Sequence, residues 1–278
     1  MFAGFSLAAV MVGCGVAGLH GVPVRAWLIN GAAWAVGAIL AGLASRAGAK
    51  TLVVWLVIAV VGLAATFPSS GLNGVHRWIA LGPIRLNGAE LLLPATVVAL
   101  AGLGGRSLAA LLCIFVIMGL LALQPVASQA VAFAGAAVAV LVLSDRPRLQ
   151  RGLAGLVIAV VASIACLRPD PLSPVPEVEG IIGLAAALSP LVAGLAMVIL
   201  AGAVLAPLSI LQGAFDKPVR AAACGLAAYL VLSAVAPVFG AFPVPLVGMG
   251  VSPILGAWLG FGALMGLARR SADLSADR

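Results

Sequence analysis

The sequence predicts an all-α polytopic membrane protein of about ten transmembrane helices, with a re-entrant outer loop near the C-terminus. Hydrophobic residues make up 64% of the 278-residue chain and charged residues only 8%, with a mean hydropathy of +1.25. A soluble domain of this size could not carry that composition. In addition, apolar runs of membrane-spanning length recur along the chain, and the basic residues between them alternate in number from loop to loop.

Ten apolar segments are candidate spans, since a helix needs about 20 apolar residues to cross a bilayer and about 17 suffice in a thin membrane. Short or proline-containing segments leave eight or nine crossings as an alternative. Residues 1–270 are expected to form a single bundle, and 271–278 a short cytoplasmic tail. The predicted spans are Phe2–Leu19, Ala26–Leu43, Thr51–Phe67, Ala89–Leu103, Ser107–Leu123, Val126–Leu143, Gly152–Leu167, Ile181–Ile210, Val219–Ala236 and Pro253–Leu267.

The distribution of basic residues predicts the orientation of these spans. If the N-terminus is cytoplasmic, the inner loops hold 11 of the 15 basic residues, and the outer loops keep Arg25, Arg77, Arg85 and Arg168. This bias favours an even number of spans with both termini in the cytoplasm. Single arginines scattered between apolar runs also favour membrane orientation over nucleic-acid binding as the reason for the net charge of +7. The inner set is Arg46, Lys50, Arg106, Arg146, Arg148, Arg151, Lys217, Arg220, Arg269, Arg270 and Arg278.

Two proline-rich segments cannot be continuous helix. Residues 237–253 are apolar but contain four prolines, which predicts the re-entrant outer loop, because non-helical backbone at membrane depth must be buried in protein or line a cavity. Residues 167–179 (LRPDPLSPVPEVE) are expected to run extended outside the membrane. No cleavable signal peptide is expected, because the first apolar run lacks a basic region before it and leads into further spans.

The four cysteines lie in separate apolar runs without C-x-x-C spacing, so they are interpreted as small core residues. No cluster of metal ligands appears in the sequence, and neither a metal site nor a cofactor is evident. The 34 glycines and many alanines favour close packing of helices.

The most polar stretch is 67–90 (FPSSGLNGVHRWIALGPIRLNGAE), which carries the candidate binding residues. Arg77 and Trp78, with Asn73 and the weaker candidate His76 nearby, could hold a phosphate or pyrophosphate. The alternative is an ordinary interfacial anchor of Trp and Arg. Glu90 opens the next span, where its carboxylate either caps the helix or faces a cavity and pairs with an arginine.

Three further carboxylates lie in the proline-rich segment 167–179. Glu177 and Glu179 precede the span that begins at Ile181, and either could act as a general base or simply solvate the loop and cap a helix. Asp170 is a weaker candidate, interpreted as a turn residue between two prolines.

The stretch 71–82 (GLNGVHRWIALG), followed by a carboxylate at Glu90, resembles the G-x-N-G-x-x-R-W-I-x-L-G…Q-P-S-E signature of the SEDS family, the FtsW/RodA/SpoVE membrane proteins. Residues 123–130 (LQPVASQA) resemble the family's Q-P-D-L-G-T-A, and 243–253 (PVPLVGMGVSP) its P-x-P-F-I-S-Y-G-G-S-S. Glu179 aligns with the aspartate of the family's T-D-F-I-F type motif.

The sequence departs from the family at several points. The Q-P-S-E element is Asn87-Gly88-Ala89-Glu90, the aspartate of Q-P-D is Val126, and the Ser-Tyr pair is Gly248-Met249. The chain is also shorter, mostly between Pro125 and Glu179, where a large outer loop of the family is reduced to the proline-rich segment.

The resemblance implies polymerisation of lipid II at the outer face of a bacterial inner membrane during elongation, division or sporulation. Glu179 would be the catalytic base, Arg77 would hold pyrophosphate, and Asn73, Trp78 and Glu90 would shape the cleft. It also implies a class B penicillin-binding protein as partner, and a divalent cation bridging the pyrophosphate stays an open alternative. Two other functions stay open: a catalytically inactive scaffold for cell-wall synthesis partners, and a flippase for a lipid-linked substrate.

Overall fold

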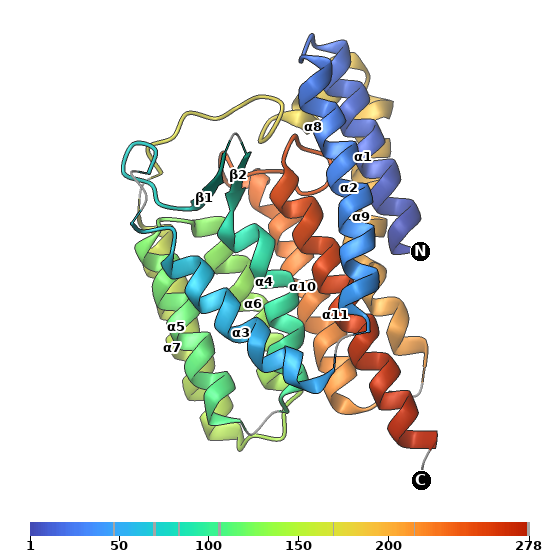
Figure 1. The fold of residues 1–278 in the computed structure, drawn as a ribbon. Coiled ribbons are helices and arrows are strands. Elements are labelled where there is room, and N and C mark those ends of the chain that lie inside the picture. The colour runs from blue at the N-terminus through green and yellow to red at the C-terminus, as the bar shows by residue number, and fades with distance from the viewer. Residues whose placement is uncertain are drawn as a thin grey trace.

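The computed structural model describes residues 1–46, 48–68, 71–82, 84–104, 107–168, 170–213 and 215–276. They form a bundle of apolar helices with one small β-hairpin at its upper end, here called the hairpin end (Figure 1). The all-α polytopic fold class is thereby confirmed. The helices are α1 (Phe2–Leu19), α2 (Val24–Ala44), α3 (Ala49–Ala64), α4 (Gly88–Gly102), α5 (Leu108–Leu123), α6 (Ala127–Val142), α7 (Arg148–Cys166), α8 (Ile181–Leu188), α9 (Pro190–Leu205), α10 (Lys217–Val235) and α11 (Val251–Ala276), with 3₁₀ segments η1 (Ala206–Gln212) and η2 (Ala236–Val238).

Within the described residues, six helical segments are long and apolar enough to cross a membrane, and four further apolar helices are shorter. The long ones are α1, α2, α7, α9 with η1, α10 and α11; the short ones are α3 to α6. Eight of these ten segments lie within a few residues of a predicted span, whereas α9 begins nine residues later than its predicted span and α11 ends nine residues later than its own. The last helix continues through most of the expected tail, to Ala276.

One predicted span, Ile181–Ile210, is not a single helix. Ser189 interrupts it in an extended conformation, with φ −169° and ψ 139°, and α9 begins at Pro190. The Ser189 side chain caps the new helix by accepting a hydrogen bond from the N–H of Leu191. Serine at the N-cap followed by proline at the first helical position is a favourable start for a helix, which explains the interruption.

The hairpin is the element that the sequence patterns did not predict. Strands β1 (Trp78–Leu81) and β2 (Ile84–Asn87) pair antiparallel, with Trp78 opposite Asn87, and the chain passes directly from β2 into α4. The hairpin therefore leads directly into the first turn of α4.

Helix α4 is the buried centre of the bundle and packs against α3, α10 and α11. A Cβ built on Gly256 of α11 would lie 1.9 Å from the carbonyl oxygen of Glu90, so only glycine permits this approach. Small residues thus bring α11 into backbone contact with α4 beside the first turn that carries Glu90.

The segment between α10 and α11 is non-helical beyond η2, as predicted, and Val244, Leu246 and Val247 are buried within it. Its backbone is joined to the other proline-rich segment: the N–H of Val244 donates to the carbonyl of Val178 at 3.1 Å, and the N–H of Met249 donates to the carbonyl of Glu177 at 2.9 Å. Segments about 70 residues apart are therefore held side by side.

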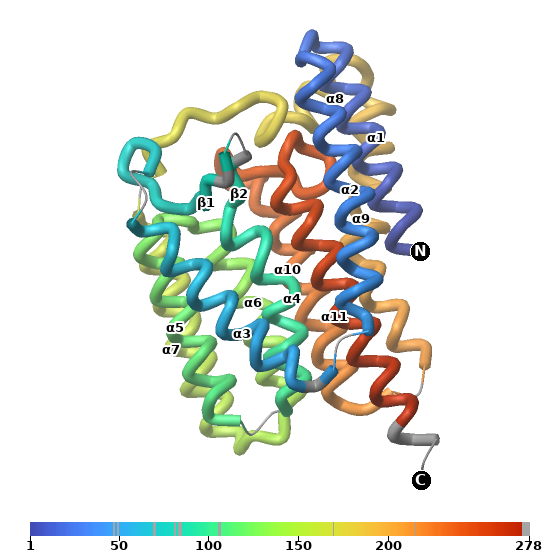
Figure 2. The backbone as a smooth tube through the Cα atoms, in the orientation of Figure 1, coloured from blue at the N-terminus to red at the C-terminus, as the bar shows by residue number. Residues whose placement is uncertain are grey.

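The segment that follows α7 crosses the hairpin end of the bundle before it reaches α8 (Figure 2). The last turn of α11 lies at the opposite end of the bundle (Figure 1). The inner loops of the predicted orientation belong to that opposite end, and two of their basic residues, Arg106 and Arg278, lie outside the described residues. The cytoplasmic location of both termini stays a prediction.

Candidate functional site

A cavity of about 460 Å³ lies at the hairpin end of the bundle. Three segments form its walls: the hairpin region 72–90, the proline-rich segment 170–179 and residues 241–253 before and at the start of α11. Six of the residues that the sequence nominates line this one cavity: Asn73, Arg77, Trp78, Glu90, Asp170 and Glu179. The two others, His76 and Glu177, are not among its lining residues.

Arg77 is buried at the cavity wall, with 7% of its surface exposed. Its Nη2 donates to Oδ2 of Asp170 at 2.7 Å, and its guanidinium lies 4.8 Å from the centroid of the Trp78 ring. The Nε of Arg77 is buried without a hydrogen-bond partner. A guanidinium that stacks on an indole and keeps an unused buried donor is suited to bind an anionic ligand.

Arg85 lies on β2 and lines the same cavity, with its side chain exposed. Among the described residues it has no ion-pair partner. Arg85 is one of the arginines near Glu90 in sequence, but among the described residues no ion pair joins them. Arg85 is therefore a second cation of the cavity, and its guanidinium is accessible.

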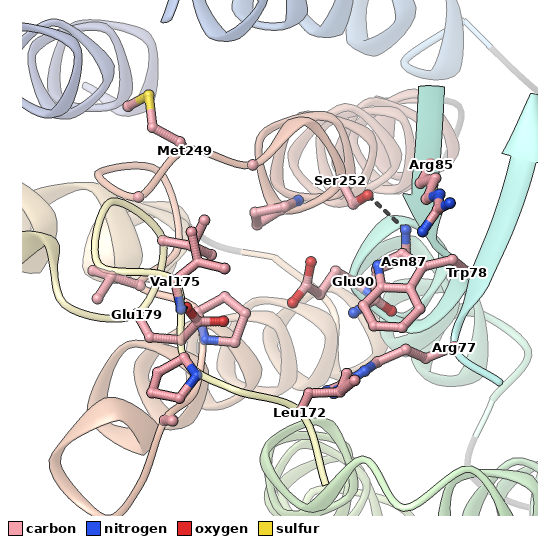
Figure 3. Close-up of a pocket in the computed structure, with 18 of the residues that line it drawn as sticks. Arg77, Trp78, Arg85, Asn87, Glu90, Leu172, Val175, Glu179, Met249 and Ser252 are labelled. Carbon is pink, nitrogen blue, oxygen red and sulfur yellow. Dashed lines mark hydrogen bonds between the residues drawn. The ribbon is translucent and has the colours of Figure 1, made fainter. Parts of the chain in front are cut away.

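Glu90 faces the cavity instead of capping α4 (Figure 3). The cap is Asn87, whose Oδ1 accepts hydrogen bonds from the N–H groups of Ala89 and Glu90 at 3.1 and 3.4 Å. In the described part of the chain, no hydrogen bond or ion pair occupies the Glu90 carboxylate. The expected pairing of Glu90 with Arg77 or Arg85 is absent, and its carboxylate stays available to a ligand.

Glu179 is held by its own loop. Its Oε2 accepts a hydrogen bond of 2.7 Å from the N–H of Val175, while its own N–H donates to the Val175 carbonyl at 3.0 Å. Burial raises the pKa of the Glu179 carboxyl, and the bond from Val175 and the charge of Arg77 offset part of the rise. A carboxylate with a raised pKa, fixed through one oxygen, has the properties of a general base.

The two remaining nominated residues lie outside the cavity. The ring of His76 packs against Phe67, with centroids 6.3 Å apart, and its Nδ1 is buried without a partner. Glu177 contributes its backbone carbonyl to the contact with Met249. The structure does not bring either side chain to the other candidate residues.

Asn73 has a clear conformational role in addition to lining the cavity. Leu72 and Val75 exchange two backbone hydrogen bonds around Asn73 and Gly74, whose φ angles are 50° and 79°. Positive φ at both central residues marks a type I′ turn, for which Asn-Gly is the preferred pair. The G-x-N-G element therefore builds a tight turn at the rim of the cavity.

Of the residues that differ from the SEDS motifs, Val126 lies away from the cavity, whereas Gly248 and Met249 lie at its wall. Val126 is the N-cap residue of α6, is 2% exposed and does not line the cavity. Gly248 and Met249 do line it. A Cβ on Gly248 would lie 2.5 Å from the carbonyl oxygen of Val178 and 2.7 Å from that of Val244, so a serine cannot fit this backbone without displacement.

Two supporting contacts at the site were not found by sequence reasoning. Oγ of Ser252 accepts a hydrogen bond of 2.8 Å from the N–H of Asn87, and Nδ2 of Asn30 donates to the carbonyl of Gly248 at 3.1 Å. Both join segments more than 160 residues apart. No local pattern in the sequence could have paired them.

The cavity is divided by charge. Figure 3 shows Arg77, Trp78 and Arg85 on one side, Glu179 and Val175 on the other, and Glu90 between them. Among the described residues, no group of three or more His, Cys, Asp or Glu side chains could hold a metal ion. A divalent cation here would depend on oxygen atoms of the substrate. The arrangement can bind an anion at one wall and accept a proton at the other.

Comparisons with known proteins identify the fold. No family model matches the chain, and no curated protein matches it significantly. Solved structures do match. Thermus thermophilus rod shape determining protein RodA is similar with a TM-score of 0.75 and 18% identity, covering 96% of this chain and 95% of that chain. A point mutant of the same protein gives a TM-score of 0.75 at 18% identity, with 96% of each chain covered.

A further similar chain belongs to a structure described as "Structural coordination of polymerization and crosslinking by a peptidoglycan synthase complex", with a TM-score of 0.72, 21% identity and 96% of each chain covered. Near-complete coverage in both directions shows that the similarity extends over the whole bundle. The chain therefore has the fold of RodA, the SEDS fold that its sequence motifs predict.

Proposed function

We propose that this protein is a SEDS-like peptidoglycan glycosyltransferase that polymerises lipid II. The observation that carries the proposal is the convergence of Arg77 and Glu179, about 100 residues apart in sequence, on one cavity whose cationic and acidic walls face each other. The RodA-like fold and the family motifs support the same function. The cavity belongs to the end of the bundle that the distribution of basic residues predicts to be outside.

The proposed reaction is an inverting transfer of a glycosyl group. The acceptor hydroxyl loses its proton to the Glu179 carboxylate as its oxygen attacks the anomeric carbon, and the bond from that carbon to the pyrophosphate oxygen breaks. The pyrophosphate leaves with the bonding electron pair, and Arg77 stabilises its charge. Trp78 supports the guanidinium, and Glu90 lies between the reacting groups. A divalent cation bridging the pyrophosphate is compatible with this scheme.

We further propose a class B penicillin-binding protein as the partner, in the cytoplasmic membrane of a bacterium. The elements of the described residues all belong to the bundle, and in this proposal the partner supplies the transpeptidase that crosslinks the glycan. The description of the third similar structure, which combines polymerisation and crosslinking in one complex, supports this assignment.

The test is glycan formation from labelled lipid II by the purified protein, alone and with its cognate penicillin-binding protein. Wild type should form polymer, while Glu179→Gln and Arg77→Ala should not. Equal polymer from wild type and Glu179→Gln would refute the role of Glu179. A well-folded wild type that forms none with its partner would refute the glycosyltransferase function.

A second candidate is a non-catalytic scaffold, which Gly248 and Met249 favour because both replace polar family residues at the cavity wall. In that case Glu179→Gln would have no phenotype in cells, and the complex with the penicillin-binding protein would persist. Complementation of a deletion strain with Glu179→Gln separates the two functions.

A further inference from the structure

We propose that Asp170 is an internal competitor for the anion site: its carboxylate occupies Arg77 until a phosphate group of the ligand displaces it. This inference rests on the proposed function insofar as it takes a polyprenyl diphosphate as the ligand. It assigns to Asp170 a part in setting ligand affinity, in addition to the turn role expected from the sequence.

The first step is the contact itself. Asp170 bonds Arg77 at 2.7 Å, and the exposed fractions of the two side chains are 25% and 9%. A carboxylate with this exposure remains partly hydrated, so the ion pair is of modest strength. A phosphate group offers more oxygen atoms and more negative charge to the same guanidinium, and it can bind in a bidentate manner.

The second step is the local anchoring of Asp170. Its Oδ1 accepts a hydrogen bond of 3.1 Å from the N–H of Leu172, while Oδ2 contacts Arg77. Pro171 and Pro174 restrict the chain that follows. The carboxylate is thus presented to Arg77 by a preformed turn, and it can be released without unfolding a helix or strand.

The third step concerns the cations that remain. Arg85 lines the cavity with no ion-pair partner in the described part of the chain, and Nε of Arg77 is buried and unpaired. A diphosphate can therefore contact Arg85 first and then replace Asp170 at Arg77. The charge of Arg77 is then neutralised throughout, first by Asp170 and afterwards by the diphosphate.

The release affects one part of the segment only. Backbone bonds from Val244 to Val178 and from Met249 to Glu177 hold the part that carries Glu179, and neither involves Asp170. When the ligand takes Arg77, residues 170–174 become free to move, while the proposed base stays in place. Displacement of Asp170 therefore leaves the position of Glu179 unchanged.

The experiment measures binding of undecaprenyl diphosphate to the full-length protein in nanodiscs. Asp170→Asn removes the charge but keeps Oδ1 for the turn, and it should bind about fivefold tighter than wild type, the effect of losing a partly exposed ion pair. Asp145→Asn is the matched control, because it disrupts the 2.6 Å ion pair with Lys217 outside the cavity. Its affinity should equal that of wild type.

A double-mutant cycle tests whether Asp170 acts through Arg77. In an Arg77→Gln background, Asp170→Asn should change the affinity by less than about twofold. The inference would be overturned if Asp170→Asn bound undecaprenyl diphosphate no more tightly than wild type. It would also be overturned if Asp170→Asn raised the affinity as much in the Arg77→Gln background as in wild type, or if no form bound the ligand. Tighter binding by Asp170→Asn together with no polymer from wild type would keep this inference and refute the glycosyltransferase. Polymer from wild type with an unchanged affinity in Asp170→Asn would keep the glycosyltransferase function and refute this inference.

Discussion

Asn87 caps helix α4 and thereby leaves the carboxylate of Glu90 free, three residues later, to face the cavity. Either residue has the chemistry to cap this helix. Because the amide oxygen of Asn87 accepts both N–H groups, the carboxylate of Glu90 is not consumed by a structural role. One side chain supports the helix, and the other is available to the site.

Replacement of the cap should therefore reduce stability and disturb the site. Asn87→Ala is expected to lower the free energy of unfolding by about 1 kcal/mol, because two N–H groups lose their acceptor. Asn87→Asp keeps an acceptor at the same place and should retain most of the wild-type stability. Thermal unfolding in detergent measures both. Equal loss in the two variants would show that the cap is not the cause.

Glu179 and Glu177 form a natural pair for testing the base. Glu179→Gln should lower the rate of lipid II polymerisation by at least about 100-fold, the usual contribution of a general base. Glu177→Gln should stay within about threefold of wild type, because Glu177 does not line the cavity and its contact to Met249 uses the backbone. Comparable loss in both variants would point to the charge of the loop.

The pH dependence of polymerisation should report the Glu179 carboxyl. Burial raises its pKa, so the carboxyl keeps its proton to a higher pH than an ordinary glutamate. The base form is lost as pH falls through this raised pKa, and the rate should decline there. Initial rates of polymerisation between about pH 4.5 and 8 measure this decline, the acidic limb of the pH–rate profile.

The N–H of Val175 lowers the same pKa, so Val175→Pro, which removes that donor, should move the limb to higher pH. Circular dichroism at each pH provides the control for unfolding. The assignment would be contradicted if the rate declined at the pKa of an ordinary glutamate, or if Val175→Pro did not move the pH of the decline.

Gly248 should resist conversion to the serine of the family motif. Gly248→Ser places a Cβ within 2.5 Å of the Val178 carbonyl oxygen, and overpacking of this kind costs about 1–3 kcal/mol. Gly250→Ser in the same segment is the control, because its nearest contact is 3.4 Å, to Pro253. Unfolding temperatures of the two variants test the prediction, which fails if both are as stable as wild type.

Asn73 allows a turn role to be separated from ligand binding. Asn73→Ala should destabilise the protein by about 1 kcal/mol, because alanine is strained at a φ of 50°. Asn73→Gly relieves the strain and should restore stability. If Asn73→Gly also restores polymerisation, the side chain acts through the turn; stability without activity would indicate a contact to the ligand.

The helices could be predicted from the sequence because apolar runs of fixed length have few alternatives in a membrane protein. The interruption at Ser189 was missed because the apolar run continues through Ser189-Pro190, although Ser-Pro is itself a helix-start signal. The hairpin was missed because β1 and β2 have only four residues each, too few for a strand pattern to stand out.

The nominated site residues came from the family motifs and from rare polar residue types, and six of them line one cavity. The role of each residue within the site could not be predicted from the sequence. Whether Glu90 or Asn87 caps α4, and whether Asp170 contacts Arg77 or only forms a turn, depends on distances between segments that no local pattern encodes. Arg85 was passed over for the same reason.

The short helices α3 and α5, which carry exposed apolar side chains, have a consequence for the surrounding lipid. A helix of 16 residues is about 24 Å long, whereas the hydrocarbon core of a typical bilayer is about 30 Å thick. We expect hydrophobic mismatch of this size to thin the bilayer beside α3 and α5. A polyprenyl-anchored headgroup would then lie several ångströms deeper there than in undisturbed membrane. For the lipid-linked substrate proposed above, such thinning would bring the sugar closer to the protein.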